Sequence, residues 1–154
     1  MMCMKKVALA AIALVSGLGA GSAVAASKSL SANAPDLVPI ADRMKHGTVS
    51  VRNVGSANAG SFVVTVQCQK QGGGGCAEPN PRAAAPYEDP AYPNRLVVTV
   101  TGLEQGKVFN HKIAFWDALV WPAGSFNLLV HVDPGAAVAE TNEGNNIYGT
   151  VYSP

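Results

Sequence analysis

The sequence has 154 residues, of which 14% are charged and 48% are hydrophobic, with a formal net charge of +1 at pH 7. This length fits one domain with a short additional segment and leaves too little chain for two sizeable cores. The low charged fraction excludes a disordered, highly charged chain. The near-zero net charge argues against a nucleic-acid partner, which would require a basic surface.

Residues 1–26 have the pattern of a secretory signal peptide. Two lysines precede the apolar run Val7–Val15, and small residues then allow cleavage after Ala25 or Ala26. Neither this run nor any other stretch reaches the about 18 apolar residues of a membrane-spanning helix. We therefore expect a protein that is secreted or periplasmic and does not span a membrane. Signal removal leaves nine Lys and Arg against ten Asp and Glu.

The cysteine count agrees with export. Three cysteines are present, and signal removal leaves two, Cys68 and Cys76. An even count in an oxidising compartment predicts one disulfide. A redox pair or a metal site is the alternative, but seven residues intervene where redox pairs favour Cys-x-x-Cys. The glycines 72–75 allow the chain to turn back between the two sulfurs.

The rest of the chain is predicted to be all-β. Residues 27–34 are small and polar and are expected to form a flexible lead-in, whereas residues 35–154 form one domain. This domain contains short runs with period-two alternation between Gly, Pro and Asn, which is typical of strands. The expected strands are 36–40, 48–53, 61–69, 95–101, 107–115, 125–132 and 147–152. About seven strands predict an immunoglobulin-like antiparallel β-sandwich, with a small barrel as the alternative.

One long segment, residues 70–94, interrupts this rhythm, and we refer to it as the insertion. It contains four consecutive glycines and five prolines. Such a composition excludes a regular helix or a central strand. A connection of this length within a compact domain is often functional or mobile.

Two motifs resemble the bacterial CARDB family, whose name denotes a cell-adhesion-related domain found in bacteria. The first is Val51-x-Asn53-x-Gly55 followed by Ala59-Gly60-x-Phe62-x-Val64; the second is Val130-x-Val132-Asp133 followed by Val138-x-Glu140-x-Asn142-Glu143-x-Asn145-Asn146. Leu103-x-x-Gly106 also fits a turn of this family. The resemblance extends over residues 35–152 and departs at the insertion. It implies an Ig-like module, usually non-catalytic, of exported bacterial proteins.

The loop between the last two expected strands gathers oxygen-bearing side chains. Asp133, Glu140, Asn142, Glu143 and Asn145 are donors of the kind that Ca²⁺ accepts, although their spacing does not fit an EF-hand. The favoured interpretation is that these side chains hydrogen-bond to local backbone groups. We therefore predict no cofactor, with calcium kept as the alternative.

Four aromatic residues provide the best candidate binding site. Tyr87, Tyr92, Trp116 and Trp121 fall in or beside irregular segments, where rigid aromatic rings can stack on sugars or contact a protein. We expect one of the two tryptophans to fill the core.

Catalysis has little support from sequence motifs. No nucleophile elbow, zinc-protease motif or phosphate-binding loop is present. The adjacent carboxylates Glu88 and Asp89 could be drawn as a glycosidase pair, but neighbours on a loop need not converge. The histidines His46, His111 and His131 come from separate segments, which does not favour a metal site.

We therefore predict an exported, non-catalytic Ig-like module that binds an unidentified protein or glycan at the cell surface or in the periplasm. The alternative is a structural subunit of a surface or periplasmic assembly that uses its exposed sheet edges. A hydrolase is the least favoured interpretation.

Overall fold

The computed structural model describes residues 33–92 and 95–154. The predicted signal peptide, residues 1–26, and most of the predicted lead-in lie outside the described residues. Among the helices of the described part, none is long and apolar enough to cross a membrane.

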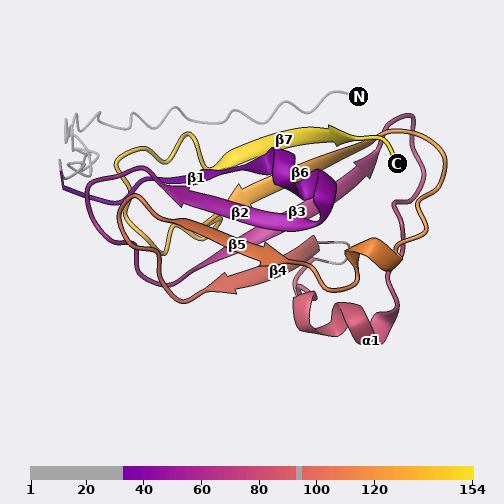
Figure 1. Ribbon diagram of the computed structural model, residues 1–154, viewed down its shortest axis with the longest axis horizontal. Coiled ribbons are helices and arrows are strands. Elements are labelled where there is room, and N and C mark those ends of the chain that lie inside the picture. The colour runs from indigo at the N-terminus through magenta and orange to yellow at the C-terminus, as the bar shows by residue number, and fades with distance from the viewer. Residues whose placement is uncertain (1–32, 93–94) are drawn as a thin grey trace, which may run out of the picture.

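Seven strands form two antiparallel sheets that pack face to face (Figure 1), which confirms the predicted all-β sandwich. The strands are β1 (Leu37–Pro39), β2 (Thr48–Asn53), β3 (Phe62–Lys70), β4 (Arg95–Val100), β5 (Val108–Lys112), β6 (Phe126–Val132) and β7 (Ile147–Tyr152). The smaller sheet has the order β1-β2-β5 and the larger sheet the order β4-β3-β6-β7. Each strand coincides with an expected run to within a few residues.

The core lies between the inner faces of the two sheets. On β2, Val49 and Val51 are fully buried, as their alternation with polar residues predicts. On β3, the alternating residues Phe62, Val64 and Val66 are also buried. The core-facing side chains thus follow the period of two, and this period is what identifies the strands in the sequence.

Short helical turns close the ends and sides of the sandwich. The 3₁₀-helix η1 (Ala41–His46) joins β1 to β2 and buries Met44, and it contacts β7 where Thr150 Oγ1 donates to Asp42 Oδ1 at 2.9 Å. Another 3₁₀-helix, η3 (Trp116–Ala118), follows β5. The strand predicted over 107–115 is shorter in the structure, where β5 ends at Lys112 and the chain then leaves the sheet.

The described part of the insertion is compact. It contains the single-turn helix α1 (Pro81–Ala84) and the 3₁₀-helix η2 (Ala85–Tyr87), with Pro81 at the first helical position. The predicted disulfide is present and links Cys68 on β3 to Cys76, with 6.3 Å between the two Cα atoms. The insertion then returns to β4, where Glu88 forms an isolated bridge with Leu96.

Asn53 organises the end of the sandwich opposite the insertion. It is fully buried and its Oδ1 accepts from the backbone N–H groups of Asp36 and Gly55 at 3.2 and 3.1 Å. Its Nδ2 donates to the carbonyls of Ala57 and Leu103 at 2.8 and 3.0 Å. The Asn-x-Gly motif thus ties β1, β2 and the turn before β5 together through one amide.

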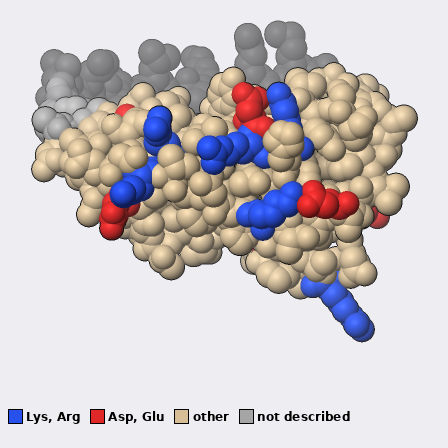
Figure 2. All heavy atoms as spheres, in the orientation of Figure 1, with Lys and Arg blue, Asp and Glu red and all other residues tan. Residues whose placement is uncertain are grey.

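Charged side chains are few and scattered over the visible face (Figure 2), as expected for a chain with 14% charged residues. Several Lys and Arg side chains on this face lie beside Asp or Glu side chains, whereas the one that projects at the lower right stands apart from them.

Candidate functional site between the insertion and the sandwich

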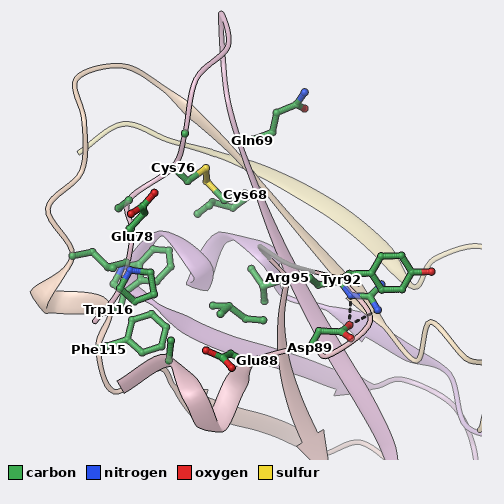
Figure 3. A pocket seen from close by; sticks show the side chains of 18 of the residues that line it. Cys68, Gln69, Cys76, Glu78, Glu88, Asp89, Tyr92, Arg95, Phe115 and Trp116 are labelled. Carbon is green, nitrogen blue, oxygen red and sulfur yellow. Dashed lines mark hydrogen bonds and ion pairs between the residues drawn. A yellow bond between two sulfur atoms is a disulfide. The ribbon is translucent and has the colours of Figure 1, made fainter. Parts of the chain in front are cut away.

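A pocket of about 980 Å³ opens between the insertion and the sandwich. Its floor is made by side chains of the larger sheet, among them Val66, Leu96 and Leu128. The insertion forms one wall, and the segment around η3 forms another. The disulfide Cys68–Cys76 lies in the lining and holds the start of the insertion against the end of β3 (Figure 3).

Trp116 and Trp121 form the aromatic end of the pocket. Trp116 is only 6% exposed, and its ring centroid lies 5.2 Å from that of Trp121. Trp121 is half-buried and packs against Phe126 and Tyr152, each at a centroid distance of 4.9 Å. One tryptophan thus belongs to the core, as expected, and its partner links the core to the pocket.

Gly47 fixes the position of the Trp116 indole. This glycine follows η1 with a positive φ of 65°, and its N–H donates to the carbonyl of Met44 at 2.9 Å. A Cβ atom at this position would lie 2.0 Å from Trp116 Cγ. The indole therefore packs directly on the glycine backbone, which no larger residue would permit.

Tyr92, Arg95 and Asp89 form the opposite end of the pocket (Figure 3). The Arg95 guanidinium lies 4.0 Å from the Tyr92 ring centroid and forms an ion pair with Asp89. Burial raises the pKa of the Asp89 carboxyl, but the Ala91 and Tyr92 N–H groups and Arg95 outweigh burial and hold it below its usual value. Tyr92 itself is 55% exposed and is available to a ligand.

Tyr87 anchors the insertion rather than lining the pocket. Its hydroxyl lies 3.1 Å from His111 Nε2 on β5, and its ring meets the Phe115 ring edge-on at a centroid distance of 5.5 Å. These contacts hold η2 against the smaller sheet, while the disulfide holds the other end of the insertion against the larger sheet. The pocket wall is therefore attached to both sheets.

Two carboxylates, Glu78 and Glu88, lie on the pocket lining with exposed side chains. Neither has a hydrogen-bond or ion-pair partner for its side chain within residues 33–92 and 95–154. Figure 3 shows Glu78 beside Trp116, and Glu88 between Phe115 and Asp89. The adjacent carboxylates Glu88 and Asp89 therefore differ in their surroundings. Asp89 forms an ion pair with Arg95, whereas the Glu88 side chain has no such partner among the described residues.

A smaller pocket of about 430 Å³ adjoins the first and shares Trp116, Leu119 and Trp121 with it. Lys45 and Lys112 line this smaller pocket, and both are paired. Lys45 contacts Asp42 at 2.9 Å, and Lys112 contacts Asp117 at the same distance.

The residues named for calcium are engaged in hydrogen bonds that hold the loop before β7. Asp133 accepts from the N–H groups of Ala137 and Val138 at 3.0 and 2.8 Å, and Asn142 Oδ1 accepts from Gly144 N at 2.9 Å.

Glu140 connects the same loop to β1. It is 1% exposed, and its carboxylate accepts from Leu37 N at 2.5 Å and from Asn146 Nδ2 at 2.9 Å. The Glu140 N–H in turn donates to Glu143 Oε1 at 3.2 Å, and Asn145 Nδ2 donates to Asp36 Oδ1 at 2.8 Å. Burial raises the pKa of Glu140 to about 7, assisted by the neighbouring charges of Glu143 and Asp133 and opposed by the two donors.

No group of three or more His, Cys, Asp or Glu side chains is arranged to hold a metal ion within the described ranges. The three histidines lie apart in the fold: His46 belongs to η1, while His111 and His131 lie on strands of different sheets.

The structure therefore places three of the four predicted aromatics, Tyr92, Trp116 and Trp121, on the lining of one pocket and leaves Tyr87 outside that lining. Sequence reasoning missed Arg95 and Glu78 as pocket residues. Arg95 begins a strand and Glu78 lies beside the prolines of the insertion, so no local pattern marks either of them.

Residues 88–150 match the model of the CARDB family. The matched span is shorter than residues 35–152, over which the sequence motifs resemble this family. No curated protein matches the chain.

The solved structures that resemble the chain include the following two. One is a domain of a candidate cell surface protein from Methanosarcina acetivorans, with 24% identity, a TM-score of 0.48 and coverage of 78% of this chain and 91% of that chain. The other is the CARDB domain of a Pyrococcus furiosus protein in complex with di-metal ions, with 19% identity, a TM-score of 0.44 and coverage of 79% and 94%.

Proposed function

Residues 88–150 of this chain belong to the CARDB family, and we propose that the protein is an exported, non-catalytic binding module. Its ligand is a protein or glycan at the cell surface or in the periplasm. We place the ligand in the pocket between the insertion and the sandwich. The pocket is the observation that carries this proposal, because it converts residues scattered over the chain into one concave, aromatic-lined surface.

The chemistry of the lining supports recognition rather than simple packing. Aromatic rings provide a large contact area at low entropic cost, and an exposed ring on the pocket lining offers a stacking surface. Tyr92 is such a ring, held by the Arg95 side chain, whereas Trp116 and Trp121 are fixed by the core. A preformed pocket of this kind spends little free energy on ordering when a ligand binds.

The test compares two tyrosines of equal exposure. Tyr92 lines the pocket and Tyr148 lies on β7, and both are 55% exposed. The purified protein and its Tyr92→Ala and Tyr148→Ala variants are applied to arrays of glycans and peptides. We expect ligands that bind the wild type and the Tyr148→Ala variant but lose at least about fivefold in affinity to Tyr92→Ala.

Ligands that bind all three proteins equally would refute the pocket as the binding site. Circular dichroism of both variants controls for folding, and neither substitution is expected to unfold a protein whose core excludes both rings.

The edge strand β7 of the larger sheet favours a second candidate function, a subunit of a surface or periplasmic assembly. β7 pairs only with β6 among the described strands, and its six residues include no charged residue and no proline. Ile147 and Val151 on this strand are 53% and 52% exposed. Edge strands without charges or proline are prone to pair with another chain.

Sedimentation velocity tests this candidate. If the protein assembles through β7, oligomers should appear as concentration rises, and Val151→Lys should abolish them while Tyr92→Ala leaves them intact. A monomer at every concentration would rule out self-assembly through this edge.

A further inference from the structure

We propose that the ligand of the pocket is a peptide segment that combines apolar side chains with lysine or arginine. This inference rests on the proposed binding function and assigns the chemical class of the partner. It follows from the pocket lining, which places uncompensated negative charge beside an apolar floor.

The charges of the lining do not cancel. Four ionised side chains line the pocket, namely Glu78, Glu88, Asp89 and Arg95. Asp89 and Arg95 neutralise each other in a largely buried ion pair. Glu78 and Glu88 have no partner among the described residues, so the pocket carries two excess negative charges. A bound cation would be attracted to them, whereas a carboxylate or phosphate would be repelled.

The two lysines of the adjoining smaller pocket do not supply the missing positive charge. Lys45 and Lys112, in the adjoining smaller pocket, are already paired with Asp42 and Asp117. Both lysines line the smaller pocket only, and neither contributes to the lining of the larger pocket. The carboxylates of Glu78 and Glu88 therefore remain available to a partner.

The apolar floor of the pocket favours a cation that is carried on an apolar side chain. Leu96, Leu128 and Val66 cover the sheet side, and Phe115, Trp116 and Trp121 cover the aromatic end. Lysine and arginine have long aliphatic stems that pack on such surfaces while their charged ends stay near solvent. The exposed carboxylates at the rim and the apolar floor beneath them match this division of the side chain.

The size of the pocket indicates a segment rather than one side chain. Its volume of about 980 Å³ lies at the upper end of the range for compact ligands. A neutral glycan could stack on Tyr92 but would leave the two carboxylates without a charged partner. A peptide with two basic residues flanking apolar ones uses both features of the lining.

Intrinsic tryptophan fluorescence provides a direct readout. The chain has two tryptophans, Trp116 and Trp121, and both line the pocket. The probes are three tetrapeptides without aromatic residues: acetyl-Lys-Leu-Leu-Lys-amide, acetyl-Gln-Leu-Leu-Gln-amide and acetyl-Glu-Leu-Leu-Glu-amide. We expect the lysine peptide to change the fluorescence in a saturable manner, the glutamine peptide to bind several-fold more weakly, and the glutamate peptide to bind least.

Charge-neutralising variants locate the effect. Glu78→Gln and Glu88→Gln should each weaken the lysine peptide by about twofold to fivefold, as is typical of exposed ion pairs, and leave the glutamine peptide unaffected. Raising the salt concentration should erase the difference between wild type and variants. Glu104→Gln is the matched control, because Glu104 is also exposed but lies in the turn before β5, outside the lining.

Two outcomes would overturn the inference. Either the lysine and glutamine peptides bind equally well, or both glutamine variants retain the full affinity of the wild type for the lysine peptide. The proposed binding function fails separately, when no ligand of the arrays distinguishes Tyr92→Ala from Tyr148→Ala. A glycan that binds through Tyr92 and is indifferent to Glu78 and Glu88 would preserve that function and refute the basic peptide.

Discussion

The buried carboxyl of Glu140 should make the stability of this protein fall as pH rises from about 5 to about 7. Glu140 is 1% exposed and its pKa is raised from 4.5 to about 7, chiefly by burial. Between these two values the folded protein retains a proton that the unfolded chain releases. The free energy of unfolding therefore decreases with pH in this window and is constant above about pH 7 with respect to this group.

The size of the effect follows from the pKa difference. Each pKa unit corresponds to about 1.4 kcal/mol, so the shift of Glu140 limits the change to about 3 kcal/mol. For a domain of this size, whose total stability is about 5 to 15 kcal/mol, such a change is easily measured. Chemical denaturation at pH 5 and at pH 8 gives both values directly.

Glu140→Gln is the perturbation that isolates this group. The Gln Oε1 can accept from Leu37 N as the carboxylate does, but its amide N–H₂ would face the Asn146 Nδ2 donor. Asn146 Oδ1 is buried and has no hydrogen-bond partner within the described residues. Turning the Asn146 amide by 180° presents this oxygen to the new N–H₂ group. The lost contact is the 3.4 Å hydrogen bond from Asn146 Nδ2 to Glu143.

We therefore expect Glu140→Gln to match the wild type near pH 5 and to be more stable than the wild type at pH 8, by at most about 3 kcal/mol. The pH profiles of wild type and variant must be compared with each other, because His131 also contributes to the pH dependence. Its pKa is lowered mainly by burial and, to a smaller extent, by the charge of Arg95. That shift makes stability fall with decreasing pH below about 6.5, which is the opposite trend. Parallel pH profiles for wild type and Glu140→Gln would refute the assignment to Glu140.

Three further predictions concern stability and are measured by chemical denaturation. Replacing Cys68 and Cys76 together by Ser should cost about 2.5 kcal/mol, because the bridge closes a nine-residue loop, and should reduce ligand binding because the insertion loses one attachment. Asn53→Ala should cost about 3 kcal/mol, since four hydrogen bonds to backbone groups are lost, and a cost below about 1 kcal/mol would contradict this role. Gly47→Ala should cost about 3 kcal/mol through positive φ and the clash with the indole, whereas Gly135→Ala, with open space around it, should be nearly neutral.

The strands were predictable because each carries its own signal. Alternation such as Val49 and Val51 inward against Ser50 and Arg52 needs no knowledge of the partner strand. The turn of η1 was not predictable in the same way. Met44 and Ala41 are its only buried residues, which is too few to establish a helical period, and η1 exists because it covers the side of the sandwich next to β7.

For the pocket, the sequence predicted which aromatic residues were candidates for binding but not where they lie relative to one another. Tyr92, Trp116 and Trp121 stood out because they lie outside the alternating runs. Their convergence depends on contacts between distant segments, namely the disulfide from β3 and the hydrogen bond of Tyr87 to His111 on β5. No local pattern encodes such contacts, and this is also why Tyr87 could not be separated from the other three before its neighbours were known.

The residues that identify the family and the residues that build the pocket are different sets. Asn53, Asp133 and Glu140 belong to the most recognisable motifs, and their polar atoms are directed to backbone N–H and C=O groups or to neighbouring side chains of the same loop. They stabilise the sandwich and leave little capacity for a ligand. The pocket wall comes instead from the insertion, most of which precedes the matched residues 88–150. Two proteins that share these motifs can therefore share the sandwich and still differ in what they bind, because the determinants of binding are free to vary where the fold imposes no pattern.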